Sequence, residues 1–231
     1  MTYIYDIFSK KLTEVAPFTV DLLLPSGAEN LNYVLYTDES PYKMQREWLD
    51  RLPFDIYSVN VHTGAKRLIG RSYRTAPKWS VNGKWAVMYD PIAQVWNKFD
   101  GATGKVVNIS DAMGYPMFME SYDKPAPAPA YGIAGWTADG NNVFLYDAYD
   151  WWKIDLTGER QPECLTKGYG RKHGKSIRKM TSNIDKDVFQ KDEKVIVSLW
   201  DKDTMDEGVY QLDMKGRLRK LMEGNYVYTI H

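Results

Sequence analysis

The stretch WSVNGKWAVMYD (Trp79–Asp90) recurs without a gap as WTADGNNVFLYD (Trp136–Asp147). Both copies begin with Trp, have Gly in the fifth position and close on Tyr-Asp. The residues that follow also correspond, as VWNKFDGATGK (95–105) and WWKIDLTGE (151–159). Self-similarity of this kind indicates a repeat architecture, in which each copy is one supersecondary unit.

Two weaker copies flank this pair. One combines residues 32–38 with 55–69, and the other combines 195–201 with 208–221. Each copy reads as strand, turn, apolar strand ending in Asp, third strand, tight turn and short fourth strand. The tight turns contain glycines, which adopt positive φ at low cost. These are Gly64, Gly104, Gly158 and Gly216. A four-stranded unit repeated in this way predicts an all-β protein, a β-propeller.

We expect 1–231 to be a single β-propeller domain or fragment. Its four blades are predicted at about 17–70, 71–111, 130–167 and 177–224. Two partial blades remain, a hairpin at 3–15 and a strand at 226–230. Either these two pair to close a fifth blade, or the chain is an open arc of a larger ring. We favour the arc, whose open blade edges would support a homodimer.

Composition limits the classes of partner. The 231 residues carry 30 Lys plus Arg and 30 Asp plus Glu, and this balance argues against nucleic acid. An aromatic content of 14% favours strands that pack on both faces. Membrane insertion is not expected, because no stretch approaches the roughly 20 apolar residues of a spanning helix. The opening MTYIYDIFSKK lacks a basic start before an apolar run, so we expect no signal peptide in this sequence.

Motifs that would indicate chemistry are incomplete. No serine lies in a Gly-x-Ser-x-Gly nucleophile elbow. GYGRKHGKS (168–176) has Tyr169 where a phosphate-binding loop needs its first Gly, so we interpret it as a basic connection with solvated charges. Those charges are Arg171, Lys172, Lys175 and Arg178. DKDTMDEG (201–208) lacks the Gly of a calcium loop, and the histidines are isolated in sequence. We therefore expect no catalytic residue, cofactor or metal in this chain.

Two insertions interrupt the repeat. PYKMQREWLDRLP (41–53) places apolar residues on one helical stripe, which is compatible with a short helix over the ring. We favour the alternative, a loop that covers an apolar edge. The stripe consists of Met44, Trp48, Leu49 and Leu52. Residues 111–130 end in PAPAPA, which cannot be a central strand, and we interpret them as an excursion between blades. Such excursions often carry recognition surfaces.

Aromatic residues divide into packing and binding candidates. Trp79 matches Trp136, and Trp96 is aligned with Trp152, so these four are assigned to packing between blades. Trp48 and Trp151 lack that match and are predicted to be exposed. Asp90 and Asp147 are expected to accept hydrogen bonds from turn amides. The candidate ligand or partner contacts are Trp48, Tyr122, Tyr131, Trp151, Tyr169 and Arg171.

Several runs together resemble the propeller region of bacterial prolyl oligopeptidase (S9) family serine peptidases, especially of the Bacteroidetes type. Trp-Ser-x-x-Gly-Lys also recurs in TolB-like and WD40-like propellers. The resemblance covers nearly the whole chain. The runs are ESPYKMQREW (39–48), DIYSVNVHTGAKRLI (55–69), WSVNGKWAVMYDP (79–91), VNIS (107–110), YGIAGWTADGNNVFLYDAYDWWKIDLTG (131–158) and LTKGYGRK (165–172).

The resemblance implies a non-catalytic propeller that filters peptide substrates for an α/β-hydrolase domain with a Ser-Asp-His triad. This sequence stops before such a domain, so no catalytic residue is carried over and the parent is expected to be the serine peptidase. The resemblance also implies a periplasmic or extracellular location. The alternative is a free-standing propeller that binds a protein or glycan partner through residues 111–130.

Overall fold

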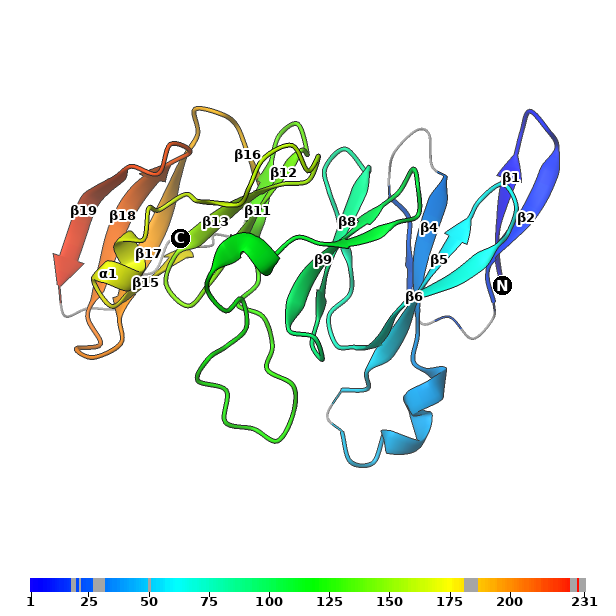
Figure 1. Ribbon diagram of the computed structural model, residues 1–231, viewed down its shortest axis with the longest axis horizontal. Helices are drawn as coiled ribbons and strands as arrows, with labels where there is room; N and C mark the ends of the chain where they lie inside the picture. Colours follow the sequence, from blue (N-terminus) through cyan, green and yellow to red (C-terminus); the bar gives the residue numbers. More distant parts are fainter. Residues whose placement is uncertain are drawn as a thin grey trace. The chain divides into compact units, whose positions relative to one another are not determined.

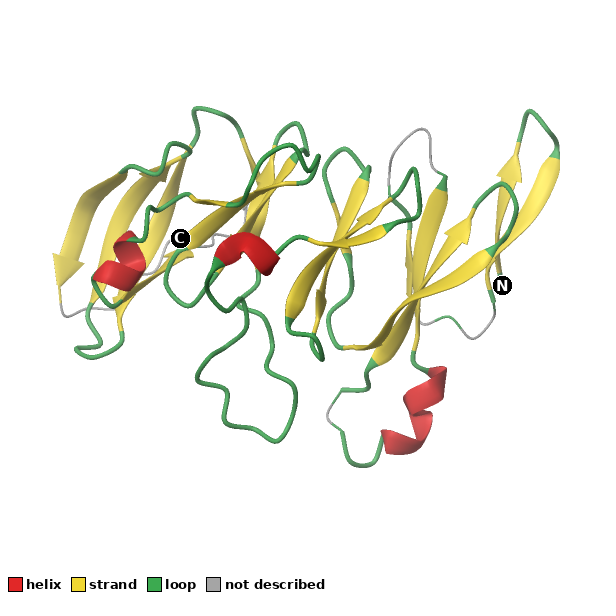
Figure 2. Ribbon diagram, viewed as in Figure 1, coloured by secondary structure: helices red, strands yellow, loops and turns green. Residues whose placement is uncertain are grey.

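The computed structural model describes residues 1–17, 20, 22–26, 32–49, 51–180, 187–224 and 228. The regular secondary structure of the described residues is almost entirely β, arranged in five mostly antiparallel sheets with three short helical segments (Figures 1 and 2). The chain divides into two compact units, Met1–Asn108 and Ile109–His231. Repeated four-stranded antiparallel sheets are the building unit of a β-propeller, so the all-β prediction is confirmed at that level.

The first unit contains three sheets. A hairpin at the N-terminus is followed by two four-stranded sheets in the orders β3-β4-β5-β6 and β10-β9-β8-β7. Between β4 and β5 lies the 3₁₀ helix η1 (Ser40–Gln45). The strands are β1 (Thr2–Asp6), β2 (Lys11–Ala16), β3 (Leu22–Leu24), β4 (Tyr33–Asp38), β5 (Phe54–Asn60), β6 (Lys66–Tyr73), β7 (Lys78–Trp79), β8 (Trp85–Asp90), β9 (Val95–Asp100) and β10 (Val106–Asn108).

The second unit contains two sheets, in the orders β14-β13-β12-β11-β16 and β15-β17-β18-β19. The 3₁₀ helix η2 (Asp111–Met113) begins the unit, and the short helix α1 (Tyr169–Lys172) precedes β15. The strands are β11 (Ile133–Thr137), β12 (Asn142–Tyr146), β13 (Trp151–Asp155), β14 (Glu163–Cys164), β15 (Lys175–Lys179), β16 (Val188–Phe189), β17 (Lys194–Asp201), β18 (Glu207–Asp213) and β19 (Leu218–Gly224).

The predicted segments can be placed against these sheets. The hairpin expected at 3–15 is formed by β1 and β2, whereas the strand expected at 226–230 lies outside the described residues apart from Tyr228. Ring closure and the single-domain assignment therefore stay predictions. The four turn glycines all have positive φ, as predicted: Gly64 at 74°, Gly104 at 70°, Gly158 at 84° and Gly216 at 79°.

Side chains pack between neighbouring sheets within each unit. In the first unit, Leu35, Ile56, Met88 and Phe99 belong to one buried cluster that joins the β3–β6 and β7–β10 sheets. Trp79 packs against this cluster, and its indole Nε1 donates to the Leu24 carbonyl at 2.9 Å. In the second unit, one cluster likewise joins strands of both sheets. Strands β4, β5, β8, β12 and β18 contain consecutive buried residues and are therefore buried on both faces, which is the pattern a blade needs.

Strand β16 departs from the repeat. It adds to the β11–β14 sheet in parallel, with Trp136 paired to Val188 and Thr137 to Phe189. Gly135 has a φ of 155°, and a Cβ there would lie 2.7 Å from the Asp187 carbonyl oxygen and 2.5 Å from the Phe189 ring. Glycine at 135 thus allows an additional strand to approach β11, a contact that the repeat pattern did not predict.

The exposed position predicted for Trp151 is wrong, because its side chain is completely buried. Strand pairing shows the reason. Trp96 pairs with Tyr89, and Trp151 pairs with Tyr146, so Trp151 and not Trp152 is the structural equivalent of Trp96. A one-residue shift along a strand moves every side chain to the opposite face. Trp152 is also largely buried, but it faces the candidate site described below.

The insertion after β4 does not cover an apolar edge as a whole. Leu52 is buried, but Met44 and Trp48 are 86% and 76% exposed. The exposure predicted for Trp48 is therefore confirmed. The phenol of Tyr42 donates to Asp55 at 2.5 Å, which attaches η1 to β5. The insertion is thus attached to β5 through η1, and it exposes the large apolar side chains of Met44 and Trp48 to solvent.

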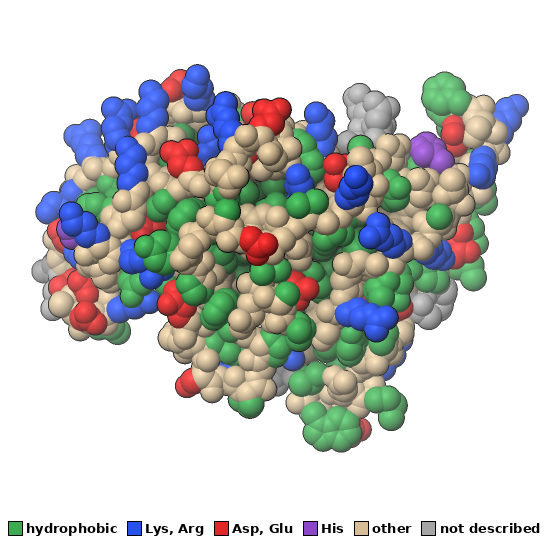
Figure 3. Space-filling view, in the orientation of Figure 1, with side chains coloured by type: hydrophobic (Ala, Val, Ile, Leu, Met, Phe, Trp, Pro, Cys, Tyr) green, Lys and Arg blue, Asp and Glu red, His purple; other side chains and the backbone are tan. Residues whose placement is uncertain are grey.

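Charged residues cluster on part of the second unit. Figure 3 shows Lys and Arg side chains gathered over the region of β17–β19. Exposed residues there include Lys194, Lys215 and Arg219.

Among the described residues, no helix has the length and apolar character needed to cross a bilayer.

Candidate functional site

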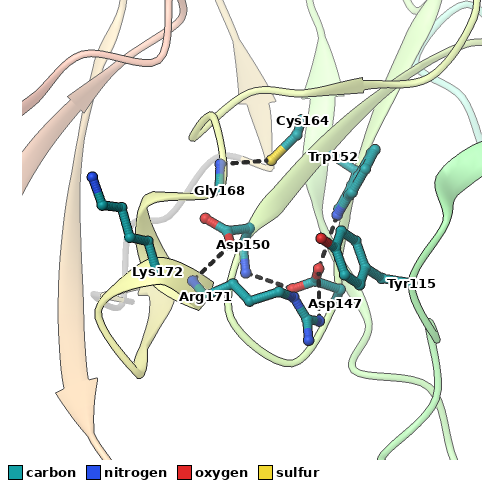
Figure 4. Close-up of a pocket in the computed structure, with 8 residues that line it drawn as sticks. All are labelled: Tyr115, Asp147, Asp150, Trp152, Cys164, Gly168, Arg171 and Lys172. Atoms are coloured by element: carbon teal, nitrogen blue, oxygen red, sulfur yellow. Dashed lines mark hydrogen bonds and ion pairs between the residues drawn. The ribbon is translucent and has the colours of Figure 1, made fainter.

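A cavity of about 320 Å³ lies at the end of strand β12, where the chain turns into β13. It is lined by Tyr115, Asp147, Asp150, Trp152, Cys164, Gly168, Arg171 and Lys172, all from the second unit (Figure 4). The lining comes from three sources: the β12–β13 turn with β13, the segment from β14 into α1, and the excursion after η2. Only Arg171 of the predicted contact residues lines it.

Asp147 organises the turn between β12 and β13. Its Oδ1 accepts from the amides of Tyr149 at 2.7 Å and Asp150 at 2.6 Å, so the predicted turn role is confirmed. Its Oδ2 accepts from Trp152 Nε1 at 3.1 Å and pairs with Arg171 at 3.3 Å. The side chain is 1% exposed, so these four donors compensate the burial of a charge.

Asp150, which the sequence analysis did not identify, attaches α1 to the same turn. Its Oδ1 accepts from the Thr166 hydroxyl at 2.6 Å and from the Gly170 amide at 2.9 Å. Its Oδ2 accepts from the Arg171 amide at 2.9 Å. Gly170 is closely surrounded, since a Cβ there would lie 2.6 Å from the Tyr149 carbonyl oxygen. The buried carboxylate therefore fixes the position of Arg171.

Arg171 lies between two tyrosine rings. Its guanidinium carbon is 4.0 Å from the ring centre of Tyr115 and 5.0 Å from that of Tyr149. It also pairs with Glu120 at 3.7 Å. Burial alone would lower the pKa of Arg171, but the Asp147 and Glu120 carboxylates raise it above its ordinary value. Arg171 is therefore a stacked, paired cation, and the interpretation of this residue as a solvated charge is wrong.

Arg178 is also not a solvated charge. Its guanidinium donates to the carbonyl oxygens of Ile177, Asp147 and Ala148 at 2.8, 2.7 and 3.2 Å. It stacks on Tyr146 at 4.7 Å and on Tyr131 at 5.3 Å. Burial lowers the pKa of this guanidinium. Arg178 thus holds the back of the Asp147 turn, whereas Lys172 is exposed as predicted.

Cys164 lines the cavity as a thiol. Its sulfur accepts from the Gly168 amide at 3.2 Å, and burial raises the thiol pKa. A raised pKa keeps the thiolate fraction low, and thiolate is the nucleophilic form. Within the described residues, no group of three or more His, Cys, Asp and Glu side chains is placed to hold a metal ion.

The other predicted contact residues are dispersed. Tyr131 is linked to the site through Glu120, whose amide donates to its phenol oxygen at 3.1 Å, and burial raises the pKa of that phenol. Tyr169 packs on the core of the second unit, and its ring lies against that of His173, with ring centres 4.4 Å apart and planes tilted by 39°. Tyr122 lies in the excursion, and Trp48 belongs to the first unit. Their role as contacts stays a prediction.

Comparison with known proteins gives fold-level likenesses only. No protein-family model and no curated protein sequence matches the chain. Among solved structures, it is similar to dipeptidyl peptidase 4 of Porphyromonas gingivalis, with a TM-score of 0.47, 12% identity and coverage of 97% of this chain and 38% of that one. It is similar to TolB of Acinetobacter baumannii, with a TM-score of 0.40, 12% identity and coverage of 96% and 48%.

The chain is also similar to acylaminoacyl peptidase of Pyrococcus horikoshii, with a TM-score of 0.41, 12% identity and coverage of 89% of this chain and 32% of that one. It thus spans less than half the length of each of these three proteins. The assignment of propeller-like sheets rests on the strand orders and on the sequence repeat.

Proposed function

We propose that this chain is a non-catalytic propeller portion of an S9 prolyl oligopeptidase-like serine peptidase. In this role it restricts the access of peptide substrates to a hydrolase domain encoded outside this sequence. The proposal places the protein in the periplasm or outside the cell. It is supported by the repeated four-stranded sheets and by the family resemblance of the runs around the two Tyr-Asp strand ends.

The observation that carries the proposal is the fixed excursion in the second unit. Met113 and Met117 are each 2% exposed, so its first half is anchored in apolar surroundings. Phe118 bridges to Ala130, which closes the base of the loop. Tyr115 and Glu120 attach it to Arg171. An ordered loop beside a cavity can select ligands by shape, which a filter requires.

The contacts in the cavity support a selecting role over a catalytic one. Both buried carboxylates accept hydrogen bonds from the protein's own groups, and Cys164 is held as a thiol. A nucleophile needs an activating base within hydrogen-bond reach. Within the described part of the chain, Cys164 contacts the Gly168 amide and the Thr166 hydroxyl, and neither is such a base.

The first test is to sequence the gene downstream of the His231 codon. A hydrolase domain with a Gly-x-Ser-x-Gly elbow supports the proposal, and a stop codon overturns it. The second test uses the full-length protein with residues 121–127, the outer part of the excursion, replaced by two glycines. We expect kcat/KM to rise for long peptides and to stay unchanged for a chromogenic dipeptide. An equal response of both substrates would contradict the filter.

A free-standing binding propeller is the second candidate, and the exposed apolar side chains of the excursion favour it. Tyr115 is 47% exposed and Met119 is 39% exposed. In this role the excursion would dock a protein or glycan partner. A gene that ends at His231, together with loss of partner binding in the excursion variant, would support this candidate over the first.

A further inference from the structure

Positive charge gathers at one end of the β15–β19 sheet, which we call the basic end (Figure 3). Strand β17 begins at Lys194, β18 ends at Asp213 and β19 begins at Leu218, and strand pairing places these three positions at the same end. Lys167 also lies there, because a Cβ on Gly216 of the β18–β19 turn would be 3.7 Å from Lys167 Cε. The exposed cations of the basic end are Lys167, Lys191, Lys194, Lys215, Arg217 and Arg219.

The opposite end of the same sheet carries negative charge. Asp201 closes β17, and the turn that follows contains Asp203 and Asp206 together with Lys202. A surface that only has to be soluble mixes the two signs, whereas a field of one sign attracts partners of the opposite sign. The sorting of charge along this sheet therefore favours an acidic partner at the basic end and disfavours it at the other.

Much of the positive charge at the basic end is not paired. Arg217 is neutralised by Asp213, with 2.6 Å between its Nε and the carboxylate. Asp192 and Glu193 follow Lys191 in the turn before β17 and offset part of the remaining charge. Four cations take part in none of the ion pairs found among the described residues. They are Lys167, Lys194, Lys215 and Arg219.

Strand β19 adds apolar side chains to this surface. Leu221 and Met222 are 45% and 51% exposed. Among the described residues β19 pairs with β18 only, so it is an edge strand. Lys220 pairs with Tyr210 and Met222 pairs with Val209, which leaves Leu221 in a bulge. Because a bulge and a lysine both hinder the addition of a further strand, this edge is suited to contacts through side chains.

We propose that the basic end, together with Leu221 and Met222, docks an acidic peptide segment of another protein. Carboxylates of the segment pair with Lys194, Lys215 and Arg219, and its apolar side chains cover Leu221 and Met222. A polysaccharide polyanion would satisfy the cations but leave the two apolar side chains in water. Exposed ion pairs are individually weak, so several must act together. The inference goes beyond the filter role, which requires no partner at β19.

Fluorescence anisotropy with the 231-residue protein tests the proposal. The labelled probe is (Glu-Glu-Leu)3, and the controls are (Glu-Glu-Ser)3 and (Lys-Lys-Leu)3. Binding of the probe should weaken at least about fivefold when salt rises from about 50 to about 500 mM, because salt screens exposed charges. The serine peptide should bind several-fold more weakly, and the lysine peptide should not bind. Equal binding of the leucine and serine peptides would indicate a general polyanion surface and overturn the proposal, as would no binding of the probe.

Substitution of the cations locates the binding. Lys215→Gln combined with Arg219→Gln should weaken binding of the probe several-fold. Lys43→Gln combined with Arg46→Gln is the matched control, because it removes one lysine and one arginine that are also exposed but belong to the first unit. All four positions are exposed, so the urea midpoints of both variants should match that of the parent. Equal effects of the two double substitutions on binding would overturn the proposal.

A second variant tests the apolar part of the surface. Leu221→Ser combined with Met222→Ser should reduce the affinity for (Glu-Glu-Leu)3 to that for (Glu-Glu-Ser)3, while the affinity for the serine peptide stays unchanged. This readout separates the docking surface from the filter role, since it requires no peptidase activity. If the variant binds the leucine peptide as tightly as the parent does, the apolar side chains of β19 take no part and the proposal is overturned.

Discussion

The β12–β13 turn and the β8–β9 turn begin with the same Tyr-Asp pair, yet they differ in their surroundings. Asp90 accepts from the amides of Ile92 and Ala93, both at 2.9 Å, and Ile92 in that turn is 67% exposed. Asp147 makes the equivalent amide contacts but is 1% exposed. The first turn is thus a solvated hairpin end, whereas the second forms part of the lining of a cavity.

The difference arises from what surrounds the turn in each unit. In the second unit, α1 contributes Arg171, and the excursion after η2 contributes Tyr115 and Glu120. Asp150 connects α1 to the turn, and the corresponding residue of the β8–β9 turn is Ala93. The repeat therefore supplies a common turn, and the Asp150 carboxylate, α1 and the excursion after η2 convert one copy of it into a candidate site.

The largest loss of stability is expected from truncating Trp96 or Trp151, which occupy equivalent positions in two copies of the repeat. Trp151→Ala should lower the free energy of unfolding by roughly 4 kcal/mol, because a large side chain leaves a core cavity. Trp96→Ala should cost less. Trp151 lies against Phe144, Tyr146 and Phe189 and donates to the Ile177 carbonyl oxygen. Urea unfolding of both variants measures the difference, and an equal or larger loss for Trp96→Ala would contradict it.

The same pair of tryptophans shows what sequence could predict. The repeat, the turn glycines and the Tyr-Asp strand ends are local patterns, and each is present in the structure. The wrong prediction that Trp151 is exposed follows from matching Trp96 with Trp152, its neighbour in the sequence. Alignment on the closing residues Asp100 and Asp155 pairs Trp96 with Trp151, so the correct signal was present in the sequence.

The candidate site was harder to predict because its contacts join distant segments. Asp150 bonds to residues of α1, and Arg171 meets Glu120 across the excursion. Neither contact has a fixed spacing that would mark it in one sequence. Strand β16 was missed for a related reason, since the only local sign is Gly135 where the previous copy has Lys78.

The second prediction compares the loss of Asp147 with the loss of Asp90, the aspartate at the same position of the other copy. Asp147→Ala should lower the free energy of unfolding by about 3 kcal/mol, because it leaves Arg171 and the Trp152 indole without their buried acceptor. Asp90→Ala should cost about 1 kcal/mol, the value of a turn hydrogen bond. Urea unfolding of the two variants gives the comparison. Similar losses at both positions would show that burial of the Asp147 turn adds nothing.

The third prediction tests the additional strand. Gly135→Ala should lower the free energy of unfolding by about 2 kcal/mol, because its Cβ would meet the Asp187 carbonyl oxygen. Lys78→Ala, the matched change before Trp79, should stay within about 0.5 kcal/mol. Amide exchange provides a local readout. The Trp136 amide donates to Asp187 at 2.7 Å and should lose protection in Gly135→Ala. If the Trp136 amide keeps its protection in Gly135→Ala, glycine at 135 is not needed for the approach of β16 to β11.

The smallest effect on stability is expected from Tyr89 and Tyr146, the tyrosines of the two Tyr-Asp strand ends. Burial raises the pKa of both Tyr89 and Tyr146 to about 12 from an ordinary value of 10. Between these values the folded chain keeps phenol protons that the unfolded chain has lost, so stability should fall as the pH rises from 10 towards 12. Tyr89→Phe and Tyr146→Phe should each flatten this fall, although Tyr146→Phe also loses the bond from the Lys179 amide.

Urea midpoints at pH 9, 10 and 11, with phenolate absorbance recorded in parallel, measure this dependence. Tyr146→Phe should be less stable than the parent at pH 9, because the lost hydrogen bond acts at every pH, and its midpoint should then decline less steeply. Tyr89→Phe should show the reduced slope as well. An unchanged slope in both variants would mean that the two phenols titrate alike in the folded and unfolded chains, and that burial at the Tyr-Asp strand ends does not hold their protons.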